Sequence, residues 1–279
     1  MSKIGTNQIA VNAQKAMSQI QRKMTKTMEK LSTGFRINKS GDDAAGLAVS
    51  TKMTAQIRGT NQAGRNISDA IALVQTADGA TKEISSIMQR MRELAVQGAT
   101  ETYSTDELAL MDTEYQQLES EITRIVTQTK WNKMELLDGS GGSGGAGAFI
   151  IQVGSDNAQS MTVSIGNLDI AAGSLGCLSG LDVSTQSNAS SAITNIDGAF
   201  QTLATIRADY GSYMNRLENT LNNAEVFSAN MSDANSRLMD TDYAKEMTEF
   251  ARSQIVRQAG MAMLSQANAI PNQVLQLLQ

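Results

Sequence analysis

Apolar residues recur at every third or fourth position near both ends of the chain. The spacing runs over residues 7 to 31 and returns from about residue 243 onward, with small or polar residues between the apolar ones. Side chains spaced in this way share one face of an α-helix. The pattern therefore predicts an amphipathic helix at each end, and we expect its apolar stripe to drive association. The stripe residues are Ile9, Ala13, Ile20, Met24 and Leu31 in the first helix and Met247, Ala251, Ile255 and Ala262 in the last.

Helical periodicity also fills most of the chain between these two ends. It extends from Ala44 to about Gly98, from 108 to 125 and from 193 to 238. Residues 32 to 43 instead hold many Gly, Asn, Ser and Asp residues, which favour turns and helix caps. We therefore expect the first helix to end near Ser32 and the second to begin at Asp42 or Asp43, with a connector between them.

The periodicity disappears in the middle of the chain. Residues 138 to 147 read DGSGGSGGAG, a composition typical of a flexible linker. The segments FIIQV and MTVSI that follow are rich in strand-forming residues and are separated by turn residues. This arrangement predicts the two strands of a β-hairpin.

The outermost helices carry apolar stripes for which an isolated chain offers no third element. Long exposed stripes usually mark a partner surface. In the alternative, the two terminal helices pair with each other within one chain. The pattern by itself leaves both interpretations open.

Composition argues against several functional classes. The formal net charge of −5 disfavours a protein that binds nucleic acid by neutralising phosphates. The chain has no His and holds no nucleophile elbow, phosphate-binding loop or zinc motif, which are the common signatures of catalytic and metal sites. We therefore assign no catalytic, cofactor-binding or metal-binding residue and expect a protein that is not an enzyme and needs no cofactor.

The single cysteine and the N-terminal sequence bear on the route of export. Cys177 has no partner for a disulfide within the chain, so we expect it to act as a small buried apolar group. No apolar run is long enough to span a bilayer, and the start MSKIGTNQIAVNAQKAM lacks the hydrophobic region of a signal peptide. We therefore expect no membrane insertion and no export by the general secretory route, which leaves open a secretion apparatus that reads an uncleaved N-terminus.

Residues 29 to 53, EKLSTGFRINKSGDDAAGLAVSTKM, resemble the N-terminal signature of bacterial flagellins. Further blocks resemble the same family in the same order, and together they cover both ends and most of the chain outside about 140 to 190. These blocks are MQRMRELAVQ, TKWNKMELLDG, FIIQVGSDN, NRLENTLNN, SRLMDTDYAKEMTEFARSQI and the ending QANAIPNQVLQLLQ.

The resemblance implies a mainly α fold. Both chain halves would form a long coiled-coil-like helical rod with a small β-hairpin region, and the terminal helices would form a separate paired-helix domain, the inner tube. The implied segments are 1–33 (terminal helix), 34–43 (connector), 44–138 (N-terminal half of the rod), 139–185 (Gly-rich linker and β-hairpin), 186–238 (C-terminal half of the rod) and 239–279 (terminal helix).

The same resemblance implies a structural subunit that self-assembles into the flagellar filament used for swimming. Such a protein would be exported unfolded through the flagellar secretion channel and would work outside the cell. Its partners would be other copies of itself, an export chaperone, and the cap and hook-junction proteins. Two alternatives are a hook-filament junction protein and a secreted coiled-coil adhesin or translocator.

The block QRMRELAVQ resembles the flagellin surface that is read by the flagellin-sensing Toll-like receptor and that also joins stacked subunits. In this interpretation Leu94 projects as an apolar knob one turn after Arg90. In the alternative, Arg90 only forms a salt bridge with Glu114 inside one chain. The residues implied as contacts are Gln89, Arg90, Glu93, Leu94 and Gln97, with Glu114 on the adjoining helix.

Overall fold

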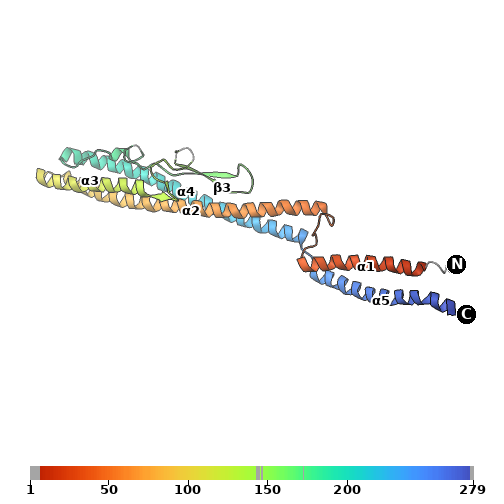
Figure 1. Ribbon diagram of the computed structural model, residues 1–279. Coiled ribbons are helices and arrows are strands. Elements are labelled where there is room, and N and C mark those ends of the chain that lie inside the picture. The colour runs from red at the N-terminus through yellow and green to blue at the C-terminus, as the bar shows by residue number, and fades with distance from the viewer. Residues whose placement is uncertain (1–6, 143–144, 146, 172, 277–279) are drawn as a thin grey trace. The chain divides into compact units, whose positions relative to one another are not determined.

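The computed structural model describes residues 7–142, 145, 147–171 and 173–276 of the 279-residue chain, with side chains placed up to residue 269. The fold is mainly α, as the sequence predicts (Figure 1). The chain divides into two compact units, residues 1–55 with 230–279 (unit 1) and residues 56–229 (unit 2). The helices are α1 (Gln8–Thr33), α2 (Ala44–Gly98), α3 (Thr105–Gln128), the short η1 (Gly176–Leu178), α4 (Gln186–Met239) and α5 (Tyr243–Gln276).

Unit 1 is built on an antiparallel pair of helices, α1 and α5. The Asn7 side chain caps α1 and donates from Nδ2 to the carbonyl of Ala267 at 2.7 Å, whereas Lys30 at the other end of α1 pairs with Glu246 at 2.9 Å. The least exposed positions of α1 alternate in steps of three and four, which is the heptad spacing of a coiled-coil seam. They are Ala10, Ala13, Met17, Ile20, Met24, Thr27 and Leu31.

The connector between α1 and α2 is held by backbone hydrogen bonds. Gly34 ends α1 in the left-handed conformation with φ +76°, which a residue without a Cβ adopts at little cost. Its carbonyl accepts from Thr241 N at 2.9 Å, and Arg36 N donates to the Met239 carbonyl at 2.6 Å. Asp43 then accepts a hydrogen bond from Gly46 N at 2.9 Å. The helix start expected at Asp42 or Asp43 is thus confirmed.

Unit 2 packs three helical segments around one apolar core. A capping box of Ser104 and Glu107 begins α3 after a short turn, so α3 runs back along α2. Ion pairs between α2 and α4, Arg92 with Asp197 and Arg207 with Asp78, show that these two helices are also antiparallel. The largest fully buried side chains of the three helices are Ile67, Ile84, Met88, Met91, Leu94, Tyr115, Ile122 and Tyr210.

Two small antiparallel hairpins lie in unit 2. The expected one pairs β3 (Ala148–Gln152) with β4 (Ser160–Ser164). The other pairs β1 (Lys130–Trp131) with β2 (Met134–Glu135) and was not predicted. Its turn residues Asn132 and Lys133 both have positive φ, 47° and 68°. Lys is an unusual residue for that conformation, so the sequence carried no turn signal there.

The composition of the glycine-rich segment predicts a flexible linker, but its described part is held by backbone hydrogen bonds. Gly147, at φ +65°, donates from its N–H to the Gly141 carbonyl at 2.9 Å and accepts from Ile165 N at 2.8 Å. A Cβ at Gly147 would collide with the Ile165 carbonyl. The following loop buries Leu168, Leu175 and Leu178 in the core. The sequence did not predict the burial of these leucines, because the apolar residues of the loop follow no regular spacing.

Candidate assembly and recognition surfaces

Helix α5 contacts α1 through a seam that mixes small, polar and apolar residues. Ser253 and Ala267 are only 6% and 4% exposed, and the Met17 side chain fills the space where a Cβ on Gly260 would stand. The pattern of apolar residues alone does not predict this seam, because the seam includes polar and small residues. The available signal was the alternating three- and four-residue spacing of the less exposed positions, which are Glu246, Phe250, Ser253, Arg257, Gly260, Leu264 and Ala267.

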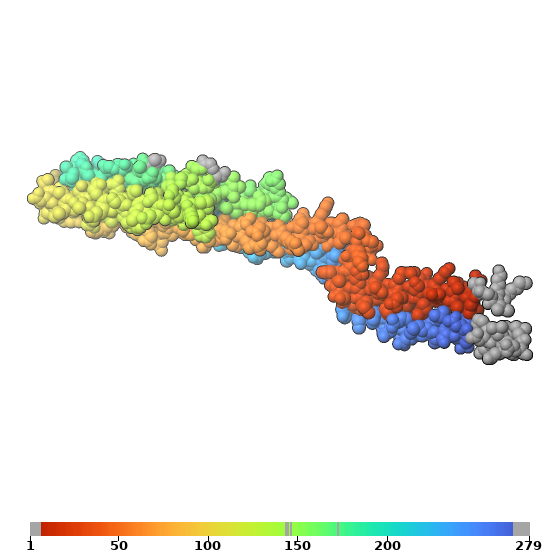
Figure 2. All heavy atoms as spheres, in the orientation of Figure 1, coloured from red at the N-terminus to blue at the C-terminus, as the bar shows by residue number. Residues whose placement is uncertain are grey.

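The other sides of α5 expose large apolar residues among polar and charged ones. In Figure 2 the blue surface of α5 runs along the red α1. All four residues of the predicted α5 stripe are exposed and lie outside the seam with α1. The pairing with α1 covers only one face of α5. The large apolar residues left exposed on α5 are Tyr243 (58%), Met247 (46%), Ile255 (65%), Val256 (42%), Met261 (51%) and Met263 (71%).

The predicted stripe of α1 is used differently. Met24 is 5% exposed, and Ala13, Ile20 and Leu31 are partly buried in the seam with α5. Ile9 is 63% exposed and lies outside the seam. The two terminal helices thus pair with each other within the chain, and this pairing covers most of the α1 stripe but leaves the α5 stripe exposed.

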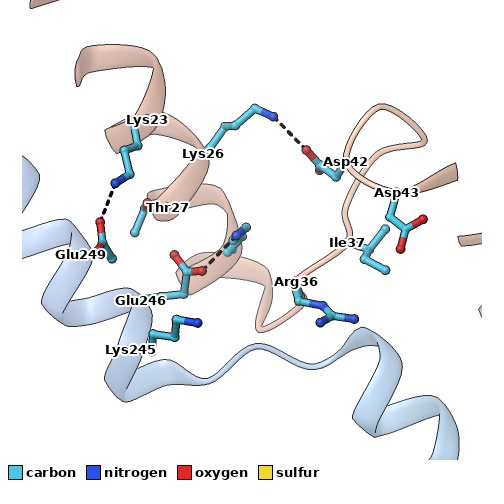
Figure 3. A pocket seen from close by; sticks show the side chains of 11 residues that line it. Lys23, Lys26, Thr27, Arg36, Ile37, Asp42, Asp43, Lys245, Glu246 and Glu249 are labelled. Carbon is cyan, nitrogen blue, oxygen red and sulfur yellow. Dashed lines mark hydrogen bonds and ion pairs between the residues drawn. The ribbon is translucent and has the colours of Figure 1, made fainter. Parts of the chain in front are cut away.

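A hollow of about 480 Å³ lies where α1, the connector and the start of α5 meet (Figure 3). Lys23 pairs with Glu249 at 2.6 Å, Lys30 with Glu246 at 2.9 Å, and Lys26 with Asp42 at 3.0 Å. The first two pairs join α1 to α5, and the third joins α1 to the connector. We call these three pairs the ion-pair clasp.

The clasp shifts the titration of two of its carboxylates. The hydrogen bond from Lys26 holds the pKa of Asp42 below its ordinary value, and the hydrogen bond from Lys23 does the same to the pKa of Glu249. In each case the nearby ammonium group favours the charged form of the acid. The hollow therefore presents compensated charges, without a nucleophile placed beside a base.

In unit 2, Arg90 links α2 to α3 on an exposed surface. Its Nε and Nη2 donate to Glu114 Oε1 at 2.9 and 2.7 Å, and its Nη1 donates to Glu93 Oε2 at 3.2 Å. These hydrogen bonds raise the pKa of Arg90 above its ordinary value. Gln89 and Gln97 are exposed beside it. The structure thus brings together five of the six residues implied as receptor contacts.

The prediction for the sixth residue, Leu94, was wrong. It is 2% exposed and belongs to the core together with Met91 and Ala95, so the expected knob is not presented at the surface. Each residue advances about 100° around a helix, and the four steps from Arg90 carry Leu94 about 40° further round, onto the buried side. The exposed apolar groups nearby are Val96 and Tyr103, 48% and 37% exposed.

Val96 and Tyr103 help to line a shallow groove of about 660 Å³ next to Arg90. Neither residue was predicted as a contact from the sequence. The sign that was available for Val96 is its position outside the apolar periodicity of α2. The groove is lined by Gln89, Arg92, Glu93, Val96, Gln97, Thr100, Thr102 and Tyr103.

Cys177 is a second correction, because it is exposed rather than buried. It is the middle residue of η1, and the neighbouring Leu175 and Leu178 are fully buried. Residues three apart in such a short turn point the same way, which leaves Cys177 on the outer side. Within the described ranges, no group of three or more His, Cys, Asp or Glu side chains is arranged to hold a metal ion. No described helix has the length and apolarity needed to cross a membrane.

Comparison with known proteins covers almost the whole chain. Residues 4–141 match the model of the bacterial flagellin N-terminal helical region, and residues 193–278 match that of the C-terminal helical region. A flagellin of Halalkalibacterium halodurans is 45% identical over 276 residues, which is 99% of either chain.

Solved structures agree with this match. The crystal structure of Bacillus cereus flagellin aligns with a TM-score of 0.50 and 34% identity over 57% of this chain and 88% of that one. A Vibrio parahaemolyticus protein assigned to the flagellar hook-associated class aligns with a TM-score of 0.60 over 71% of this chain and 100% of that one. At 12% identity, that likeness shows a shared fold alone. The matches to both terminal regions, with 45% identity over the full length, show that this chain belongs to the bacterial flagellin family.

Proposed function

We propose that the chain polymerises into a flagellar filament through its terminal helices, and that the uncovered sides of α5 are buried against neighbouring copies. One observation carries this proposal: six large apolar side chains of α5 are exposed, whereas α1 covers only the seam face. Fully burying an exposed Ile or Met side chain contributes about 1.5–3 kcal/mol. Ile255 and Met263 are 65% and 71% exposed, so most of this stabilisation is still to be gained when they are buried.

Because the chain is a flagellin, its activity is structural and not enzymatic. We propose that it works outside the cell, in the flagellum, after export in an unfolded form. An export chaperone and the cap and hook-junction proteins are proposed partners on the same basis of family resemblance. The stripe residues of α5, together with the exposed Ile9 of α1, are proposed as contacts between subunits.

The test is a charge placed on the uncovered face of α5. Ile255→Asp should stay folded, because Ile255 contributes little to the seam with α1, but it should not join filaments, because burying an unpaired carboxylate is unfavourable. Ile255→Leu is the matched control and should polymerise. Purified proteins are seeded with filament fragments, pelleted and viewed by electron microscopy.

The outcome also separates the alternatives. A secreted adhesin or translocator would stay soluble after seeding, and a hook-filament junction protein would not form long filaments by itself. Normal filaments of Ile255→Asp would rule out the uncovered face of α5 as an assembly surface.

We infer a second function for monomers, namely binding by the flagellin-sensing Toll-like receptor at the surface around Arg90. The observation that favours it is a guanidinium held between Glu93 and Glu114 beside a groove with exposed Val96 and Tyr103. Arginine and aromatic residues are common anchors of protein interfaces. The test compares receptor binding by wild-type monomer and by Arg90→Ala.

A further inference from the structure

Three thioether groups stand exposed on α5, outside its seam with α1. Met247, Met261 and Met263 are 46%, 51% and 71% exposed. Buried methionines differ sharply from these, since Met88 and Met91 in the core of unit 2 are 0% exposed. A methionine must be reached by the oxidant before it reacts. The exposed set on α5 is therefore accessible to oxidants in an unassembled subunit.

Oxidation would change the chemical nature of this surface. The thioether sulfur attacks one oxygen of hydrogen peroxide, the S–O bond forms as the O–O bond breaks, and proton transfer leaves a sulfoxide and water. The sulfur loses two electrons and the peroxide gains them. The product replaces a flexible apolar side chain with a polar one that carries a strong hydrogen-bond acceptor. An acceptor buried without a donor is unfavourable.

We propose that Met247, Met261 and Met263 form an oxidation-sensitive site, and that their conversion to sulfoxides by peroxide-class oxidants prevents a free subunit from joining the filament. This rests on the proposed function of α5 as an assembly surface. Once α5 is covered in the filament, the same sulfurs are shielded. Oxidation then acts on subunits before assembly and not on subunits already in place.

Two exposed methionines outside α5 serve as internal controls. Met134 in β2 is 41% exposed and lies in unit 2, and Met28 on α1 is 51% exposed. Both are accessible to the same oxidant without belonging to α5. Sulfoxide at Met134 should therefore leave assembly unchanged.

The experiment oxidises wild-type monomer partially with hydrogen peroxide, seeds it with filament fragments, and separates pellet from supernatant. Peptide mass spectrometry then gives the sulfoxide content at each methionine. We expect sulfoxide at Met247, Met261 and Met263 to be about tenfold enriched in the supernatant, the ratio that corresponds to a 1.4 kcal/mol penalty on incorporation. Sulfoxide at Met134 should be equal in the two fractions. Equal content of the α5 sulfoxides in both fractions would overturn the proposal.

Two variants sharpen the result. The triple variant Met247→Leu, Met261→Leu, Met263→Leu keeps the apolar surface without the sulfur, so it should still polymerise after peroxide treatment. The double variant Met28→Leu, Met134→Leu keeps the three α5 methionines. After peroxide treatment it should therefore fail to polymerise, as peroxide-treated wild type does. The opposite pattern would contradict the assignment to α5.

Failure of this proposal can be told apart from failure of the assembly surface. Ile255→Asp is tested without oxidant, so its normal polymerisation would remove the assembly surface itself. If Ile255→Asp fails to assemble while oxidised wild type assembles normally, only the oxidation site is removed.

Discussion

Arg90 on α2 donates through both Nε and Nη2 to a single carboxylate oxygen of Glu114 on α3, at 2.9 and 2.7 Å. The pair is half exposed, so it adds little to the stability of the fold. It does fix the direction of the guanidinium within the free subunit. A partner would therefore meet a pre-ordered donor group, whose ordering cost is already met by the fold.

We expect Arg90→Ala to weaken receptor binding on the order of tenfold, the effect of truncating an interface anchor. Arg124→Ala is the matched control, since Arg124 pairs with Glu121 on α3 at 2.5 Å with similar exposure outside this surface. Binding is measured on purified monomer, and filament yield is measured in parallel. If the surface is shared with filament packing, Arg90→Ala should lower both, and intact filaments should not bind the receptor. Equal binding by the two variants would leave only a structural salt bridge.

Leu94→Ala should behave as a core mutation. We expect it to lower the free energy of unfolding by about 2–5 kcal/mol, because it removes a buried side chain and leaves a cavity. Val96→Ala, at a 48% exposed position, should change it by less than about 0.5 kcal/mol. Urea denaturation followed by circular dichroism gives both values. A Leu94→Ala protein as stable as wild type would contradict the burial of this residue.

Deleting residues 1–31 or 245–279 should abolish polymerisation while unit 2 stays folded. The buried core cluster of unit 2 runs from Ile67 to Leu217 and includes no residue of α1 or α5. Its cooperative unfolding transition should therefore survive either truncation. Sedimentation reports assembly, and circular dichroism reports the remaining helix. Filaments formed by either truncated chain would count against the role of the terminal helices.

Acid should open the ion-pair clasp. The pKa values of Asp42 and Glu249 are lowered from ordinary values of 3.8 and 4.5. Groups with lowered pKa values stabilise the fold above those ordinary values, and this stabilisation is lost as the pH falls through the lowered pKa values. Protection of the connector amides against hydrogen exchange should therefore be constant near neutral pH and should decrease below about pH 4.

Hydrogen exchange at the Arg36 and Thr241 amides measures this opening, after correction for the intrinsic effect of pH. Both amides donate to backbone carbonyls across the connector. Lys26→Gln removes the partner of Asp42 and should flatten part of the pH dependence. The same response in Lys26→Gln and in wild type would show that the Lys26–Asp42 pair does not close the connector.

The sequence by itself determined where the helices lie. Asp43 and the Ser104–Glu107 capping box mark helix starts, and three- and four-residue spacing marks the helices that follow. These signals are local, since a cap or a periodic stripe depends on residues within a few positions of each other. The β3–β4 hairpin could be predicted for the same reason.

Only the tertiary structure decided which faces of those helices are covered. Periodicity gives the direction of a side chain around its own helix, but not the neighbour that it meets. Leu94 therefore turned out to be buried beside Met91, and Cys177 exposed between two buried leucines. The seam of α5 includes Ser253 and Gly260, which no hydrophobic pattern selects, because Met17 on α1 needs small residues opposite it. Complementary packing between segments far apart in the sequence is a property of the folded pair, and it left large apolar residues of α5 uncovered.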